Sequence, residues 1–152
     1  MSILGLVCFG LVFVSLLALS ACFSGCETAM LSLSPMQVQR IKERQGKAGA
    51  RLERLLAQPE VLLSTLLIGN TFVNAALASV GLTFLARLGW VPTAYLEVSS
   101  IVMVTLFVLL FGEISPKQFA IRHAEALVPF MTRLLAVAIP LLRPLSWCLQ
   151  KL

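Results

Sequence analysis

The sequence contains no aspartate, a single histidine and a single tyrosine, and it is poor in charge of either sign. Only 12% of its 152 residues are charged and 59% are hydrophobic, whereas roughly a quarter of the residues in an ordinary soluble domain are charged. A chain of this composition could not cover a water-exposed surface with polar groups, so a lipid bilayer is its expected solvent. The length is sufficient for one domain.

Neither a disulfide framework nor enzyme chemistry is expected. The cysteines form no CxxC pair and most lie in apolar stretches, so we expect them to pack against apolar neighbours. They are Cys8, Cys22, Cys26 and Cys148. No nucleophile stands with a base, so we do not expect an enzyme. The net charge of +5 lies in segments beside apolar runs, which favours contact with an anionic membrane leaflet over binding to nucleic acid.

Three segments are long and apolar enough to cross a bilayer, for which a helix needs about 20 apolar residues. We expect these spans over about residues 3–33, 61–86 and 95–116. The first has no basic residues before it and is longer than the apolar core of a signal peptide, so we expect it to be retained. The predicted fold class is an all-α membrane protein with three transmembrane helices.

The distribution of basic residues predicts the orientation of these spans. The loop between the first two spans carries six Lys and Arg residues and the segment 117–152 carries five, whereas the link between the second and third spans carries only Arg87. Because basic loops favour the cytoplasmic side, we expect the first loop and the C-terminus in the cytoplasm and the N-terminus outside. The expected location is the cell membrane, which in a bacterium is the inner membrane.

The two cytoplasmic segments have different patterns. Ser34 followed by Pro35 is typical of a helix N-terminus, and glycines at 46 and 49 interrupt the helical pattern, so residues 34–60 are predicted to form a helical hairpin. Residues 117–152 are apolar but contain three prolines and several arginines, which would be costly in a fourth span. We expect them to form short amphipathic juxtamembrane helices lying in the interface, with Trp147 as an anchor.

Uncharged oxygen-bearing side chains recur at helical spacing within the first two spans. Ser20, Ser24 and Thr28 follow one another at i, i+4 on the first span, and Asn70 and Asn74 do so on the second. Residues with this spacing lie on one face of a helix. The carboxylate of Glu27 lies close to the serine face, and ionisable groups at membrane depth indicate function by default.

The end of the third span, "LLFGEISPKQ" (109–118), places a second carboxylate, Glu113, directly after an apolar run. Pro116 has no N–H, so the carbonyl of Gly112, four residues earlier, loses its helical donor. Backbone carbonyls at broken helices bind cations in transporters. Together with the amides and hydroxyls, Gly112 and Glu113 complete an all-oxygen set that suits a hard cation such as Mg²⁺ or Na⁺.

Structural roles for the same residues stay open at this point. Serine and threonine in membrane helices often bond to the carbonyl four residues earlier in their own helix. The asparagines could join helices by hydrogen bonds. Glu113 could pair with Lys117, one turn further on, and Glu27 could reach the cytoplasmic interface and cap the hairpin.

Three segments resemble the signature motifs of the CNNM/CorC family transmembrane domain. They are "FSGCETAMLSLS" (23–34), "IGNTFVNAALAS" (68–79) and "FGEISPKQFA" (111–120). The resemblance covers nearly the whole chain, residues 1–152, with the motifs in the family's order. Cys26 and Thr71 depart from the family's usual serine and asparagine, which leaves the ion preference open.

The resemblance implies a homodimeric membrane protein that exports Mg²⁺, coupled to Na⁺. It implies an ion site formed by Ser20, Ser24, Asn70, Asn74, the Gly112 carbonyl and Glu113. Supporting roles fall to Glu27 and Thr28, to Pro116, which would keep the third helix unwound, and to Lys117 as a nearby structural cation. Family members usually continue into cytosolic CBS domains, which residues 1–152 do not include.

Other functions would use the same residues differently. The cargo could be another divalent cation such as Co²⁺. The domain could instead be a sensor that binds Mg²⁺ and regulates a partner without transport, or a membrane anchor for cytosolic domains.

Overall fold

The computed structural model describes residues 3–88 and 96–150, and all regular structure in these two ranges is helical. The all-α fold class is therefore confirmed for the described residues. The elements are α1 (Ile3–Ser32), α2 (Pro35–Leu56), α3 (Pro59–Leu88), α4 (Leu96–Phe107), the π-helix η2 (Val108–Ile114), α5 (Ser115–Arg122) and α6 (Ala124–Gln150).

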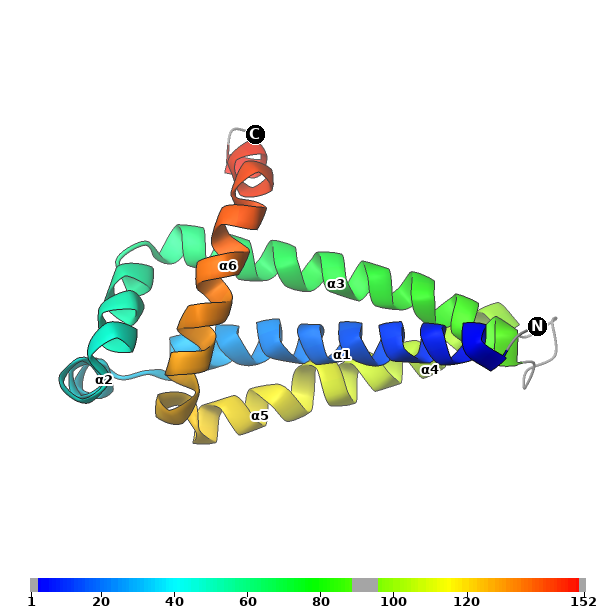
Figure 1. Cartoon of the computed structure of the whole chain (residues 1–152), viewed down its shortest axis with the longest axis horizontal. Coiled ribbons are helices and arrows are strands. Elements are labelled where there is room, and N and C mark those ends of the chain that lie inside the picture. The colour runs from blue at the N-terminus through cyan, green and yellow to red at the C-terminus, as the bar shows by residue number, and fades with distance from the viewer. Residues whose placement is uncertain (1–2, 89–95, 151–152) are drawn as a thin grey trace.

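Three long rods lie side by side in the bundle: α1, α3, and the continuous run of α4, η2 and α5 (Figure 1). Helix α1 contacts α3 on one side and η2 and α5 on the other, while α3 also contacts α4. Many large apolar side chains on these rods are exposed, among them Leu11, Phe72 and Leu106. Such surfaces suit hydrocarbon, where lipid rather than water covers the side chains.

Among the described residues, four helical segments are long and apolar enough to cross a membrane. Three of them, Leu4–Ser32, Pro59–Arg87 and Ile101–Arg122, fall on the three predicted spans, although the start of the third prediction lies outside the described residues. The fourth, Ala124–Leu142, belongs to α6. Helix α6 does not join the three rods in parallel but crosses α1 and α3 (Figure 1).

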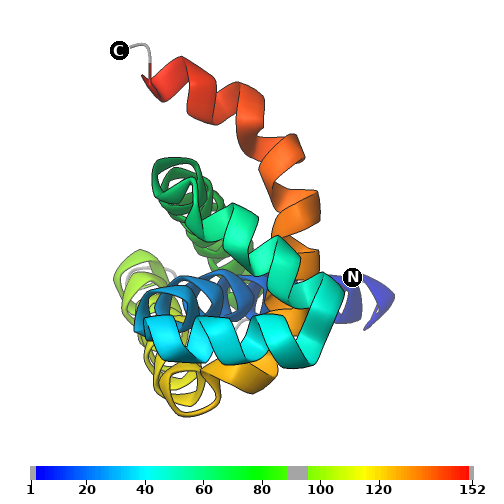
Figure 2. The ribbon, with the colours of Figure 1, turned by 90° about the vertical axis from the view of Figure 1, so that its left-hand side faces the viewer.

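Helix α2 is the hairpin that the sequence predicts. Ser34 caps it: the side chain of Ser34 accepts from the backbone N–H of Gln37, and the Gln37 side chain accepts from the backbone N–H of Ser34. The helix then bends at Gln45 and Gly46, where Gly46 adopts a φ of +31° that favours glycine. Its two halves form a corner at one end of the bundle (Figure 2).

The prediction of several short helices after the third span is wrong. After the eight residues of α5, the described part of the segment 117–152 forms one helix of 27 residues, α6. Pro129 deprives the carbonyl of Glu125 of its helical donor, but the side chain of Gln45 donates to that carbonyl at 3.5 Å. A donor from α2 thus compensates for this proline. The anchor predicted at Trp147 concerns a side chain outside the described part of the chain.

The expectation of an unwound segment at Gly112 to Pro116 also needs correction. The chain stays helical there but widens into the π-helix η2, which ends where the N–H of Ser115 donates to the carbonyl of Leu110, five residues earlier. Pro116 follows at the start of α5, where a missing N–H is best tolerated. The helix is therefore not broken before Pro116. Instead, its backbone hydrogen bonds change to the i→i−5 pattern of a π-helix.

The core lies where α2 and α6 meet the bundle. Ile41 and Leu52 of the hairpin are buried together with Val128 and Leu135 of α6 and with Leu66 of α3. Of the cysteines whose side chains are described, Cys26 is buried in this core, as predicted, whereas Cys22 is half-buried and Cys8 exposed. The hairpin and α6 are thus packed against the bundle end rather than attached by loops alone.

The two halves of the hairpin can approach each other closely only because residue 49 is a glycine. A Cβ atom at this position would lie 2.5 Å from the Cα of Lys42 and 3.0 Å from the carbonyl oxygen of Ile41, and backbone atoms cannot move aside as a flexible side chain can. We predict that Gly49→Ala lowers the free energy of unfolding by about 1–3 kcal/mol, as overpacking does. Thermal unfolding in detergent measures this loss.

The matched control is Gly10→Ala on α1. A Cβ there would lie 3.5 Å from the nearest atom, on the Phe84 ring, which is an ordinary contact, so the unfolding temperature should not fall. Equal unfolding temperatures for the two variants would contradict the close approach in the hairpin.

Candidate functional site

Hydrogen bonds between side chains join the three rods at one level of the bundle. The Ser20 hydroxyl of α1 lies 2.8 Å from Oδ1 of Asn74 and 3.4 Å from Oδ1 of Asn70, both on α3. Nδ2 of Asn74 donates to Oε1 of Glu113, on η2, at 3.2 Å. The serine and asparagine stripes predicted from helical spacing therefore meet the carboxylate of the third rod.

Gly112 brings the backbone of η2 directly against α1. It is buried, and a Cβ at this position would lie 3.0 Å from Oγ of Ser20. Only a residue without a side chain allows this approach without displacing Ser20. The main chain next to Glu113 therefore lies beside the same hydroxyl that the two asparagine oxygens approach.

The carboxylate of Glu113 has no cationic partner in the described part of the chain. The ion pairs found there are Arg40 with Glu125 and Lys42 with Glu53, so the alternative in which Glu113 pairs with Lys117 is not realised. Glu113 is half-buried, and its described polar contact is the neutral amide of Asn74. A partly buried carboxylate without a cationic partner is able to attract a cation.

Ser20 and Ser24, the two serines of α1 predicted as ligands, differ in their bonding. Both are 0% exposed. Ser20 is hydrogen-bonded to α3, whereas Oγ of Ser24, one turn along the same face, is buried and has no hydrogen-bond partner among the described residues. A buried hydroxyl without a partner is destabilising unless something else occupies its lone pairs.

The supporting residues do not all join this group. Thr28 donates to the carbonyl of Ser24 at 3.1 Å, which confirms the structural alternative for this residue. Glu27 is half-buried, and its side chain makes no ion pair with a described residue. Pro116 packs near Gly25 of α1, since a Cβ added to Gly25 would lie 3.7 Å from the Pro116 carbonyl oxygen. Lys117 is half-buried next to it.

The hydrogen bonds between the rods bring oxygen atoms together. They join the Ser20 hydroxyl, the Oδ1 atoms of Asn70 and Asn74, and the Glu113 carboxylate. The described residues contain no cluster of three or more His, Cys, Asp or Glu side chains. Oxygen donors of this kind suit hard cations, while zinc and copper favour imidazole and thiolate.

The sequence did not predict a second polar feature, a cavity of about 220 Å³ between α2 and the start of α6. Arg40, Arg44 and Gln45 of α2 line it together with Glu125 of α6. Two arginines at i, i+4 directly before the glycine bend were the signal that could have indicated a shared face.

The hydrogen bond from Ser20 to Asn74 is expected to stabilise the bundle even without metal ions. We predict that Ser20→Ala, measured in the presence of a chelator, lowers the free energy of unfolding by about 1 kcal/mol. The corresponding fall in unfolding temperature is roughly 2–4 °C for a chain of this size.

Ser15→Ala serves as the control, because Ser15 is exposed and bonds only to the Leu11 carbonyl of its own helix. It should unfold at the temperature of the unmodified chain. If Ser20→Ala behaved like Ser15→Ala, the contact between α1 and α3 would carry no stability.

Comparison with known proteins identifies the domain. Residues 11–152 match the family described as "Cyclin M transmembrane N-terminal domain". The chain is 33% identical over 134 residues to "UPF0053 protein" of Haemophilus influenzae, and 33% identical over 132 residues to "UPF0053 inner membrane protein YfjD" of Escherichia coli. It is 26% identical over 141 residues to "Metal transporter cnnm-1" of Caenorhabditis elegans.

These matches cover most of this chain but a smaller part of its relatives. They include 88%, 87% and 90% of the chain, and 31%, 30% and 16% of the three relatives. The chain thus spans about a third of the length of the two bacterial proteins. With its apolar helices and a relative named as an inner membrane protein, the chain is a multi-pass membrane protein that belongs to the cyclin M (CNNM) transmembrane domain family.

Proposed function

We propose that this domain transports Mg²⁺ out of the cell and that an opposing movement of Na⁺ drives the export. The observation that carries the proposal is the chain of contacts Ser20–Asn74–Glu113, which brings polar groups of three helices to one uncompensated carboxylate. The metal transporter named among the relatives supports a metal ion as the cargo.

The ligands proposed for Mg²⁺ are the oxygens of Ser20, Ser24, Asn70, Asn74, Gly112 and Glu113. Mg²⁺ takes six oxygen ligands and releases its water reluctantly, so this set could replace the hydration shell wholly or in part. A single carboxylate leaves one positive charge of the ion uncompensated. Binding should therefore be weak enough for release, as transport requires.

We propose three membrane spans, formed by α1, by α3, and by α4 with η2 and α5. Helix α6 would lie in the interface, since it crosses the other rods (Figure 1) and carries exposed apolar side chains such as Val137 and Leu141. The hairpin would face the cytoplasm with the C-terminus, and the N-terminus would lie outside, because the basic residues of α2 and α5 gather at one end.

We further propose that the protein works as a homodimer and that cytosolic CBS domains accompany this domain in a longer protein. The support is the family membership and the greater length of the relatives.

Flux through liposomes tests the transport proposal. The chain should carry Mg²⁺ across the membrane, faster with an opposing Na⁺ gradient, and Glu113→Gln and Asn70→Ala should each reduce the flux roughly tenfold or more, since a ligand to a charged group is worth about 1.5–3 kcal/mol. A fluorescent Mg²⁺ indicator trapped inside the vesicles measures it. Glu43→Gln, on the exposed surface of α2, is the control and should leave the flux unchanged.

Each alternative has its own outcome in this assay. If the domain bound Mg²⁺ without flux, it would be a sensor and the transport proposal would be wrong. If it transported Co²⁺ and not Mg²⁺, the proposal of Mg²⁺ as the transported ion would be wrong. If the rate of Mg²⁺ flux did not depend on the Na⁺ gradient, the proposed coupling to Na⁺ would be wrong. If Glu113→Gln bound Mg²⁺ as tightly as the unmodified chain, the proposed ion site would be wrong.

Ser24 offers a second test, because its buried hydroxyl is unpartnered. In chelator, Ser24→Ala should unfold at the same temperature as the unmodified chain or higher, since the substitution removes an unsatisfied polar group. In a Mg²⁺ titration, the concentration that gives half of the stabilisation should rise roughly tenfold.

Thr28→Val is the matched control for Ser24→Ala, because the Thr28 hydroxyl is already bonded within its own helix. Its response to Mg²⁺ should equal that of the unmodified chain. An unchanged response in Ser24→Ala would exclude Ser24 from the ligands.

A further inference from the structure

The surface between α2 and α6 carries more positive charge than its own contacts neutralise. Two cavities lie along it, one of about 220 Å³ and one of about 380 Å³. We call this surface the α2–α6 seam and define it by the residues that line these two cavities. Each cavity contains a pair of arginines from α2, namely Arg40 and Arg44 in the first and Arg51 and Arg54 in the second.

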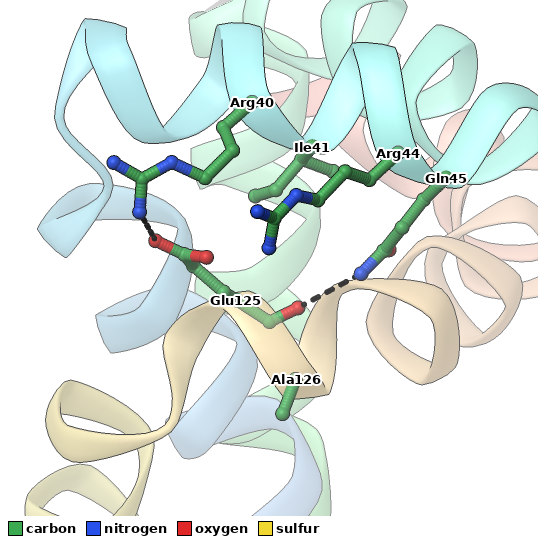
Figure 3. A pocket seen from close by; sticks show the side chains of 6 residues that line it. All are labelled: Arg40, Ile41, Arg44, Gln45, Glu125 and Ala126. Atoms are coloured by element: carbon green, nitrogen blue, oxygen red, sulfur yellow. Dashed lines mark hydrogen bonds and ion pairs between the residues drawn. The ribbon is translucent and has the colours of Figure 1, made fainter.

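The first cavity is open to an additional anion. Figure 3 shows Arg40 and Arg44 reaching from α2 toward Glu125 at the start of α6. Arg40 pairs with Glu125 at 3.8 Å, with the two side chains 51% and 36% exposed, which is a loose surface pair of small energy. Arg44 makes no ion pair with a described residue. One carboxylate therefore faces two guanidinium groups.

Gln45 joins α2 to α6 at the edge of the same cavity. Its Nε2 donates to the Glu125 carbonyl (Figure 3), while its Oε1 is buried. The groups that the cavity offers to an anion are therefore the guanidinium groups of Arg40 and Arg44. Phosphate is an anion that guanidinium groups bind well.

The second cavity repeats the excess of positive charge. Arg51 and Arg54 line it with Gln58 and with Thr132 of α6, and no carboxylate lines it. The two cavities are thus lined by four arginines and by one carboxylate, that of Glu125 in the first cavity. Guanidinium groups bind phosphate through paired hydrogen bonds, which favours arginine over lysine at such sites.

The face of α6 turned away from the seam indicates where that phosphate comes from. Phe130, Val137 and Leu141 of α6 are 53%, 69% and 74% exposed. Helical geometry puts these three side chains on one face, roughly opposite Thr132 and Ala136, which line the second cavity. A helix with an apolar face on one side and arginines along the other has the pattern of a helix lying at the lipid boundary. A water-soluble protein partner would leave this apolar face uncovered.

We propose that the α2–α6 seam binds the phosphate groups of anionic glycerophospholipids in the leaflet next to the hairpin. Arg44 and Arg51 provide guanidinium groups to the phosphates. This inference does not depend on the ion that the domain transports.

Thermal unfolding in a neutral detergent tests the proposal. Added phosphatidylglycerol should raise the unfolding temperature of the chain more than phosphatidylcholine at equal concentration. In the double variant Arg44→Gln, Arg51→Gln, this difference should fall to less than about half. Native mass spectrometry should show a matching loss of bound phosphatidylglycerol.

The control is Lys47→Gln, which removes an exposed positive charge of α2 that lines neither cavity. Phosphatidylglycerol should stabilise it as much as the unmodified chain. An equal loss in Lys47→Gln would overturn a defined site in favour of diffuse attraction between charges. Arg44→Lys with Arg51→Lys, which keeps the charge, should lose part of the effect because paired hydrogen bonding is lost.

Two further outcomes would overturn the proposal. If glycerol 3-phosphate stabilised the chain as well as phosphatidylglycerol, the seam would be a site for soluble phosphate. If phosphatidylglycerol and phosphatidylcholine acted equally, the seam would not select anionic lipids, which would overturn the proposal. Because Arg44 and Arg51 make no ion pair with described residues, the double variant should fold, which its helix content verifies.

Discussion

The amide of Asn74 is the contact on which the arrangement of the three rods depends. In lipid there is no hydrophobic force to hold helices together, so close packing and hydrogen bonds determine how they are placed. Asn74 accepts from α1 and donates to η2, and Gly112 brings η2 against α1 at the same level. One amide and one missing side chain thus bring groups from three helices together at the same level of the bundle.

A proline within a helix lacks a backbone N–H and so leaves a carbonyl without its helical donor. At Pro116 and Pro129 the structure accommodates this loss in two different ways. At Pro116 the chain changes its winding, and a π-helix leads into α5. At Pro129 the helix continues, and Gln45 supplies the donor from another element. In the first case the adjustment lies beside Glu113. In the second it ties the hairpin to α6 and forms one wall of the seam.

Local patterns in the sequence predicted those features that depend on neighbouring residues. Ser34 with Pro35 predicted a capped helix, and the glycine at 46 predicted the bend, because both depend on the backbone of adjacent residues. The spacing of Ser20, Asn70 and Asn74 predicted which faces meet, since helical geometry fixes those faces once the helices pack.

Features that depend on distant residues were not predictable in the same way. The carbonyl of Glu125, which lacks a helical donor, accepts from Gln45, 80 positions away, and no local pattern indicates this contact. At Pro116 a local pattern shows only that a donor is missing, and it does not show whether the chain breaks or winds as a π-helix. Thr28 has the spacing of Ser20 and Ser24, yet its hydroxyl bonds within α1, and nothing in the spacing distinguishes it from them.

A single residue connects the rod that carries Glu113 to the helix that crosses the bundle. The N–H of His123 donates to Phe119 and closes α5, and its carbonyl accepts from Ala126 and Leu127 and opens α6. Its ring also stacks on Phe119, with centroids 4.5 Å apart. Such an elbow has no slack, because one residue adds only about 3.8 Å of chain. If the third rod slid or turned, the start of α6 would therefore have to move with it, and a displacement at the carboxylate would be passed to the helix that crosses the bundle.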